Sequence, residues 1–181
     1  MQLHNFRVTG SLNCNKAVYQ WSRRDQLLYF ATLVPFMFAF IGAAYLLATV
    51  AIYLTVIFFL LYIAVNVFQA GCCIGCPYRG KFCPAVFGIY LGNLLAATVV
   101  YRGRTSTPGF FRINANLAEI FLAATLLFPI YWLAISNWVY IVVFLLLVTL
   151  HVIIFFPAMC TKCSYNDTCP GGQTALKLLR R

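Results

Sequence analysis

Charged side chains are scarce in this chain, and acidic ones are the rarest. Of its 181 residues nine per cent are charged, whereas about a quarter are charged in soluble domains. Only three residues are acidic and two are histidine. No carboxylates are spaced for general acid–base catalysis, and neither a Ser-His-Asp arrangement nor a glycine-rich phosphate loop is evident. Enzymatic activity is thus undecided from composition, and we do not expect the chain to be an enzyme on its own.

The charged residues avoid two long segments. None occurs from Leu27 to Gly71 or from Ile120 to Cys160, and 63% of the chain is hydrophobic, well above the roughly one half of soluble domains. A membrane-spanning helix needs about 20 apolar residues, so each segment is long enough for two helices. We therefore predict an all-α integral membrane protein with four transmembrane helices, arranged as two tandem helical hairpins.

Basic residues flank the two predicted hairpins and are missing from their turns. All thirteen fall before, between or after the hairpins: Arg7, Lys16, Arg23 and Arg24; Arg79, Lys81, Arg102, Arg104 and Arg112; Lys162, Lys177, Arg180 and Arg181. Positive residues beside spanning helices collect on the cytoplasmic side. We expect a multi-pass protein of the cell membrane with both termini cytoplasmic. Its basic loops would attract anionic lipids rather than nucleic acid.

A three-cysteine motif occurs twice, each time after a predicted hairpin. The two copies lie 87 residues apart at their first cysteine, and proline follows the last cysteine of each: Cys73, Cys76 and Cys83 with Pro84; Cys160, Cys163 and Cys169 with Pro170. Such a recurrence indicates a tandem duplication. Because both hairpins start and end on one side of the membrane, the repeats would be parallel rather than inverted.

The duplication predicts how the chain is organised. It gives a cytoplasmic segment 1–26, a first repeat 27–103, a basic linker 104–115 and a second repeat 116–181. We expect spanning helices near 27–47, 49–71, 116–135 and 138–158, with the first turn near 46–51. In each repeat a cytoplasmic cysteine loop would lead into a short interfacial or re-entrant helix, at 85–100 and 174–179. The alternative for 85–100 is a fifth, short span.

The spacing of the cysteines favours metal binding. Thiols facing the cytoplasm stay reduced, and Cys-x-x-Cys presents two thiolates to one ion. Cys72 and Cys14 are candidates to complete four-thiolate sites. The Cys-Pro endings resemble the end of the bacterial ferredoxin cluster motif, whose compact run of four cysteines is missing here. An iron–sulfur cluster and zinc both fit the spacing, and redox-active dithiols and structural disulfides are the alternatives.

Three other polar residues lie in or beside the expected spans. His151 lies within the fourth, where an ionisable group is either hydrogen-bonded between helices or functional. Asp25 and Glu119 are expected at the starts of the first and third helices, where acidic side chains favour the helix dipole.

The thiols and the membrane segments together suggest an electron-transfer or accessory subunit. Its partners would be other membrane subunits or further copies of the chain. The alternatives are a structural membrane subunit with zinc-stapled loops and a heavy-metal or thiol-dependent transporter.

Overall fold

The computed structural model describes residues 19–74, 76, 78, 82–84, 100–101, 107–164, 166 and 169–179. These residues are helical, without strands: α1 (Arg23–Val50), α2 (Ile52–Cys73), α4 (Pro108–Ser136), α5 (Trp138–Phe155), the π-helical turn η1 (Phe156–Cys160) and α6 (Pro170–Leu179). Four segments are long and apolar enough to cross a membrane, namely α1, α2, α4 and α5 together with η1. The four predicted spans are thus confirmed by length and composition. The short helix expected at 85–100 lies, apart from Val100, outside the described residues.

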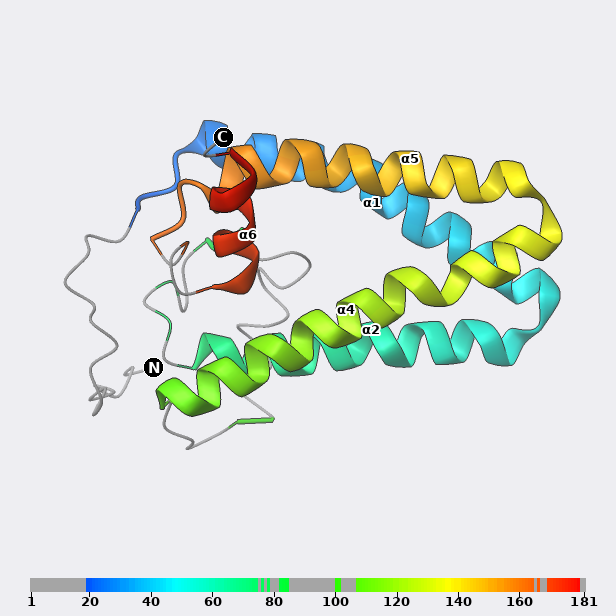
Figure 1. Ribbon diagram of the computed structural model, residues 1–181, viewed down its shortest axis with the longest axis horizontal. Coiled ribbons are helices and arrows are strands. Elements are labelled where there is room, and N and C mark those ends of the chain that lie inside the picture. The colour runs from blue at the N-terminus through cyan, green and yellow to red at the C-terminus, as the bar shows by residue number, and fades with distance from the viewer. Residues whose placement is uncertain are drawn as a thin grey trace.

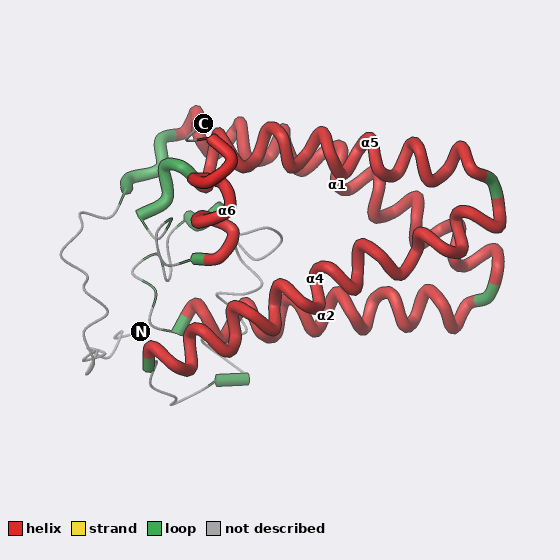
Figure 2. Tube along the Cα trace, viewed as in Figure 1, coloured by secondary structure: helices red, strands yellow, loops and turns green. Residues whose placement is uncertain are grey.

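The four long helices form two pairs that converge at one end. Helix α2 packs mainly against α4, and α1 packs mainly against α5. Figure 1 shows the pairs meeting at the end that carries both hairpin turns and diverging toward the end that carries α6. The tube in Figure 2 shows the two turns as short loops at the far end from α6.

The hydrophobic core follows this divergence. One large cluster joins all four long helices toward the turn end, and includes Phe36, Leu54, Leu133 and Phe144. At the other end there are two separate clusters. The first packs α1 against α5 and η1 and consists of Tyr29, Phe155 and Met159. The second lies at the C-terminal end of α2, packs against Phe110 of α4, and consists of Ala70, Cys73 and Ile74. Among the described residues, the two helix pairs are therefore joined by direct helix-to-helix apolar packing toward the turn end, whereas at the other end Phe82 of the loop after α2 packs against the α1–α5 cluster.

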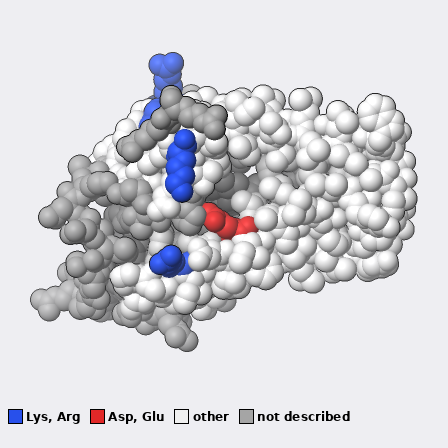
Figure 3. Space-filling model, in the orientation of Figure 1, with Lys and Arg blue, Asp and Glu red and all other residues white. Residues whose placement is uncertain are grey.

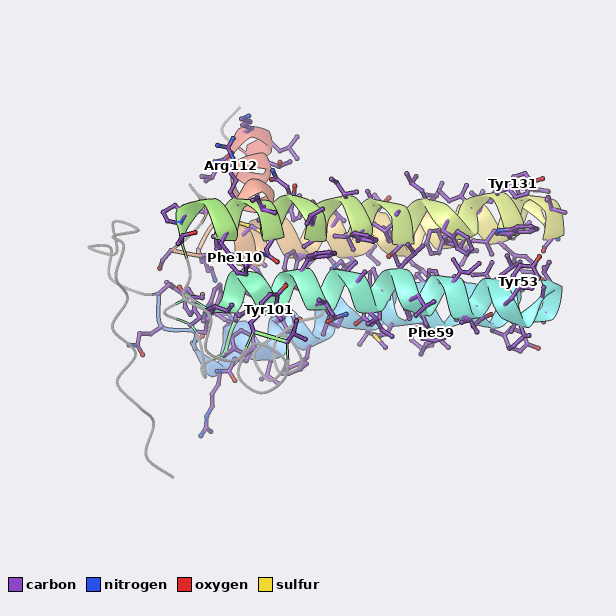
Figure 4. All side chains as sticks on the ribbon, turned by 90° about the horizontal axis from the view of Figure 1, so that it is seen from below. Tyr53, Phe59, Tyr101, Phe110, Arg112 and Tyr131 are labelled. Carbon is purple, nitrogen blue, oxygen red and sulfur yellow. The ribbon has the colours of Figure 1, made fainter. Side chains whose placement is uncertain are left out.

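Charge is distributed just as unevenly. Among the described side chains, Lys, Arg, Asp and Glu all lie toward the end that carries α6, and the half that carries the turns is uncharged (Figure 3). Figure 4 shows Arg112 toward the end that carries α6, and Tyr53 and Tyr131 at the turn end. The turn end therefore carries aromatic side chains of the kind enriched at membrane interfaces.

Both hairpins reverse at a single extended residue. Ala51 (φ −164°, ψ 132°) separates α1 from α2, and Asn137 (φ −169°, ψ 130°) separates α4 from α5. Ala51 donates its backbone N–H to the carbonyl oxygen of Leu47, and Asn137 donates its backbone N–H to that of Leu133, at 2.9 Å in both cases. Asn137 also caps α5 by accepting a hydrogen bond from Val139 N. Ala51 has no side chain that can cap a helix, so its turn was harder to place from sequence.

Two helices begin earlier than the composition suggested. Ser22 and Asp25 form a capping box that starts α1 at Arg23. Thr107 caps α4, and Pro108 occupies the first helical turn, where its missing N–H costs nothing. Since α4 starts at Pro108, Glu119 lies eleven residues inside this helix. The interpretation of Glu119 as a first-turn residue is therefore wrong.

The close packing of α2 against α4 gives a stability test. A Cβ at Gly71 would fall on the Asn114 side chain, whereas a Cβ at Gly42 would meet nothing within 4 Å. We expect Gly71→Ala to destabilise the protein by about 1–3 kcal/mol, because overpacking forces the helices apart. Gly42→Ala is the matched control and should be neutral or stabilising by up to about 1 kcal/mol. Thermal unfolding in detergent measures both, and equal melting temperatures would contradict the packing described.

Candidate thiol site

The described cysteines of both motifs lie at the end of the molecule that carries α6. Cys72 and Cys73 end α2, and Cys160 ends η1. Cys76 and Cys83 follow α2, Cys163 follows η1, and Cys169 directly precedes α6. Cys73 is buried and the other six are half-buried. Cys14 lies outside the described residues.

The two motifs touch through a pair of hydroxyl groups. Tyr78 Oη of the first motif lies 3.0 Å from Ser164 Oγ of the second. Burial raises the pKa of the Tyr78 phenol, so the phenol keeps its proton and remains able to donate. Ser164 Oγ also accepts a hydrogen bond from the backbone N–H of Tyr19 at 2.8 Å. Ser164 thus joins three segments that are far apart in sequence.

The thiol of Cys72, which directly precedes the first motif, is close enough to a thiol of the second motif to interact electrostatically. Cys72 interacts with Cys169, as well as with its neighbours Cys73 and Cys76. Cys160 interacts with Cys169 and with Cys163. Cys169 therefore lies in reach of thiols at the ends of both α2 and η1.

The thiols do not form a ready-made metal site. Within the described ranges, no three His, Cys, Asp or Glu side chains are placed to hold one metal ion. No disulfide joins the seven described cysteines. The geometry is that of reduced thiols gathered at one end of the bundle, without a closed ligand set.

An ion pair ties the second motif to the start of α1. Lys162 Nζ lies 2.7 Å from Asp25 Oδ1. The other carboxylate oxygen accepts hydrogen bonds from Ser22 Oγ (2.7 Å), Ser22 N (3.0 Å) and Tyr19 Oη (3.2 Å). The hydrogen bond to Asp25 raises the pKa of Lys162 above its ordinary 10.5, so the ammonium stays charged at neutral pH. Asp25 was expected only to favour the helix dipole; its partner Lys162 lies too far away in sequence for a local pattern to indicate it.

Aromatic rings tie the first motif to the same segment. The Trp21 ring lies 5.9 Å from the Phe82 ring and 6.4 Å from the Tyr78 ring, centroid to centroid. Phe82 also meets Tyr29 of α1 edge to face at 5.6 Å. Residues 19–25 therefore contact both cysteine motifs, a role that nothing in the sequence pattern indicated.

His151 lies away from the thiols, between α5 and α1. It is 3% exposed, and its Nδ1 lies 2.6 Å from the carbonyl oxygen of Thr32. Its ring stacks on Phe155 and meets Phe36 edge to face. The prediction that His151 bonds between helices is supported by this contact, which leaves Nε2 buried and without a partner.

Comparisons of the chain with protein-family models, with curated proteins and with solved structures find no match.

The contact between the motifs can be tested through thiol reactivity. Ser164→Ala removes the oxygen shared by Tyr78 and Tyr19, at a cost of about 1–3 kcal/mol if the partners stay unsatisfied. We expect maleimide to label Cys76 and Cys163 several-fold faster in this variant, because the loops separate more often. The control is Ser136→Ala, which removes a hydroxyl bonded to Trp132 O at the turn end. Unchanged labelling in Ser164→Ala would mean that the hydroxyl does not hold the motifs together.

Proposed function

We propose that this protein binds a metal ion or an iron–sulfur centre with thiols from both cysteine motifs, at the cytoplasmic face of the membrane. In this role it serves as an electron-transfer or accessory subunit of a larger membrane complex. The observation that carries the proposal is the contact between Tyr78 and Ser164, one residue from each motif. Since the described thiols form no closed ligand set, binding has to draw them together.

The two halves are proposed to be tandem repeats related by a twofold axis along the membrane normal. The matching turns at Ala51 and Asn137 support this, as does the pairing of α1 with α5 and of α2 with α4. Exchanging the halves maps one helix pair onto the other. Cys160 lies 23 residues after Asn137, whereas Cys73 lies 22 residues after Ala51, so the second half is longer by one residue. The π-helical turn η1 lies in this longer stretch, and such turns wind an additional residue into a helix.

The orientation and the partners follow from charge and exposure. Basic side chains at the end that carries α6 support a cytoplasmic location for it, where anionic lipids would bind them. Outward-facing apolar residues such as Phe38, Ile57 and Leu146 are suited to lipid, to other membrane subunits or to a second copy of the chain. We propose no nucleic-acid partner.

Two other functions use the same thiols. If a zinc ion only cross-links the loops, the protein is a structural subunit. The contacts of Ser164 with Tyr19 and of Lys162 with Asp25, which already hold these loops in place, favour this structural role. A heavy-metal transporter would need a path through the bundle as well as the thiols.

Metal analysis of protein purified without oxygen tests the proposal. Iron with acid-labile sulfide would support the electron-transfer role, and zinc alone would support the structural role. Protein that contains neither metal would contradict both proposals. If one centre is shared, Cys76→Ser or Cys163→Ser alone should remove most of the metal. With two independent sites, each of these variants should lose about half of the protein's total metal, by simple stoichiometry. The control Ser136→Ala should keep the full content.

Labelling of Cys76 and Cys163 in oriented vesicles tests the orientation. A membrane-impermeant maleimide should reach both residues from the cytoplasmic side, since both are half-buried rather than buried. Labelling only from the outside, and only after the protein is reduced, would place the cysteines in an oxidising compartment. Structural disulfides would then replace the metal centre.

A further inference from the structure

The indole of Trp21 contacts both ends of the loop that joins Cys76 to Cys83. Its ring centroid lies 6.4 Å from that of Tyr78 and 5.9 Å from that of Phe82. Tyr78 follows Cys76 by two residues, and Phe82 directly precedes Cys83. Both arms of the loop therefore pack on this ring, close in the chain to the two thiols.

A cysteine of the second motif packs on the same apolar cluster as Trp21. This cluster joins α1 to α5 and η1, and Cys160 and Phe82 pack against it together with the indole. Cys160 ends η1 and is half-buried. Trp21 thus lies where the first motif meets the second, although it belongs to neither.

The start of α1 fixes the backbone beside this indole. Ser22, the next residue, caps α1 and is hydrogen-bonded to Asp25 through its hydroxyl group and its backbone N–H. The carbonyl oxygen of Trp21 accepts a hydrogen bond from Gln26 Nε2 at 3.4 Å. Asp25 in turn forms the ion pair with Lys162 of the second motif. The backbone of Trp21 is therefore held in place without the use of its indole nitrogen.

The indole nitrogen itself is buried and, within the described part of the chain, has no hydrogen-bond partner. Trp21 Nε1 carries an N–H group that can only donate. A tryptophan of a membrane interface normally turns this group toward water or lipid headgroups, and a phenylalanine would pack at this position without burying a donor. Because an unsatisfied buried donor is destabilising, an acceptor that comes to this N–H would stabilise the protein.

We propose that Trp21 is a positioning residue of the thiol centre, and that its N–H donates a hydrogen bond to a thiolate sulfur when the centre is bound. Thiols bind a metal as thiolates, and a buried negative sulfur is stabilised by donors around it. Such donors adjust the metal affinity and the reduction potential of the centre. The candidate acceptors are Cys160, on the same cluster, and Cys83, next to Phe82. This role rests on the proposed function, because it needs a centre for the N–H to serve.

Nuclear magnetic resonance of the indole N–H groups tests the hydrogen bond directly. The chain has three tryptophans, and Trp132 and Trp138 are internal controls because they lie toward the turn end. In ¹⁵N-tryptophan-labelled protein in oxygen-free nanodiscs, Cd²⁺ should shift the Trp21 N–H signal downfield and leave the other two signals in place. The signal that is missing from Trp21→Phe assigns the resonance.

Substitution separates the N–H from the ring. Trp21→Phe keeps an aromatic ring and removes the donor, whereas Trp21→Ala removes both. We expect Trp21→Phe to bind Cd²⁺ about tenfold more weakly, as is usual when a hydrogen bond to a metal ligand is lost, and Trp21→Ala to bind more weakly still. Competition with a chelator, followed by the ultraviolet charge-transfer absorption of cadmium thiolate, measures these affinities. Trp138→Phe is the matched control and should bind as the unmodified protein does.

The outcomes separate this role from the proposed function. If Cd²⁺ gives the thiolate absorption but leaves the Trp21 N–H signal unchanged, the centre stands and the hydrogen bond is overturned. A loss of affinity in Trp21→Ala but not in Trp21→Phe would assign the effect to ring packing and would overturn the hydrogen bond too. If no thiolate absorption appears, the proposed function fails and the role of Trp21 fails with it. Circular dichroism of each variant shows that weaker binding does not reflect lost helix.

Discussion

The hydroxyl group of Ser164 is the point on which the thiol end of the molecule depends. Membrane helices gain little from apolar packing against one another, because lipid is as apolar as their side chains. At the thiol end, where the helix pairs diverge, polar contacts and aromatic rings together hold the loops. Ser164 Oγ is hydrogen-bonded to Tyr78 Oη of the first motif and accepts a hydrogen bond from Tyr19 N of the N-terminal segment. The ion pair between Lys162 and Asp25 holds the second motif to the same N-terminal segment.

The spanning helices could be predicted because the membrane imposes one simple condition. A segment that crosses lipid must satisfy its own backbone, and long uncharged runs therefore become helices. The ends of the helices needed finer signals. Thr107 and Pro108 form a standard helix start, which apolar composition alone does not reveal. Ala51 gave no signal at all, since an alanine turn looks like the helices on either side of it.

The candidate site was only half accessible to sequence reasoning. Spacing made the cysteines candidates, because metal ligands recur at short local intervals. It did not identify Ser164 or Lys162, whose partners lie more than a hundred residues away in Tyr19 and Asp25.

Among the described residues, direct apolar packing between the helices of the two pairs lies toward the turn end, so that the pairs can pivot about this end. The large core cluster near the turns acts as the pivot, and the 28 residues of α1 form an arm of about 42 Å. A rotation of about 2° at the pivot moves the far tip by about 1.5 Å, from the length of that arm. Side-chain exchanges at the pivot, such as a change of volume at Phe58, would therefore alter the gap between the tips without touching a thiol.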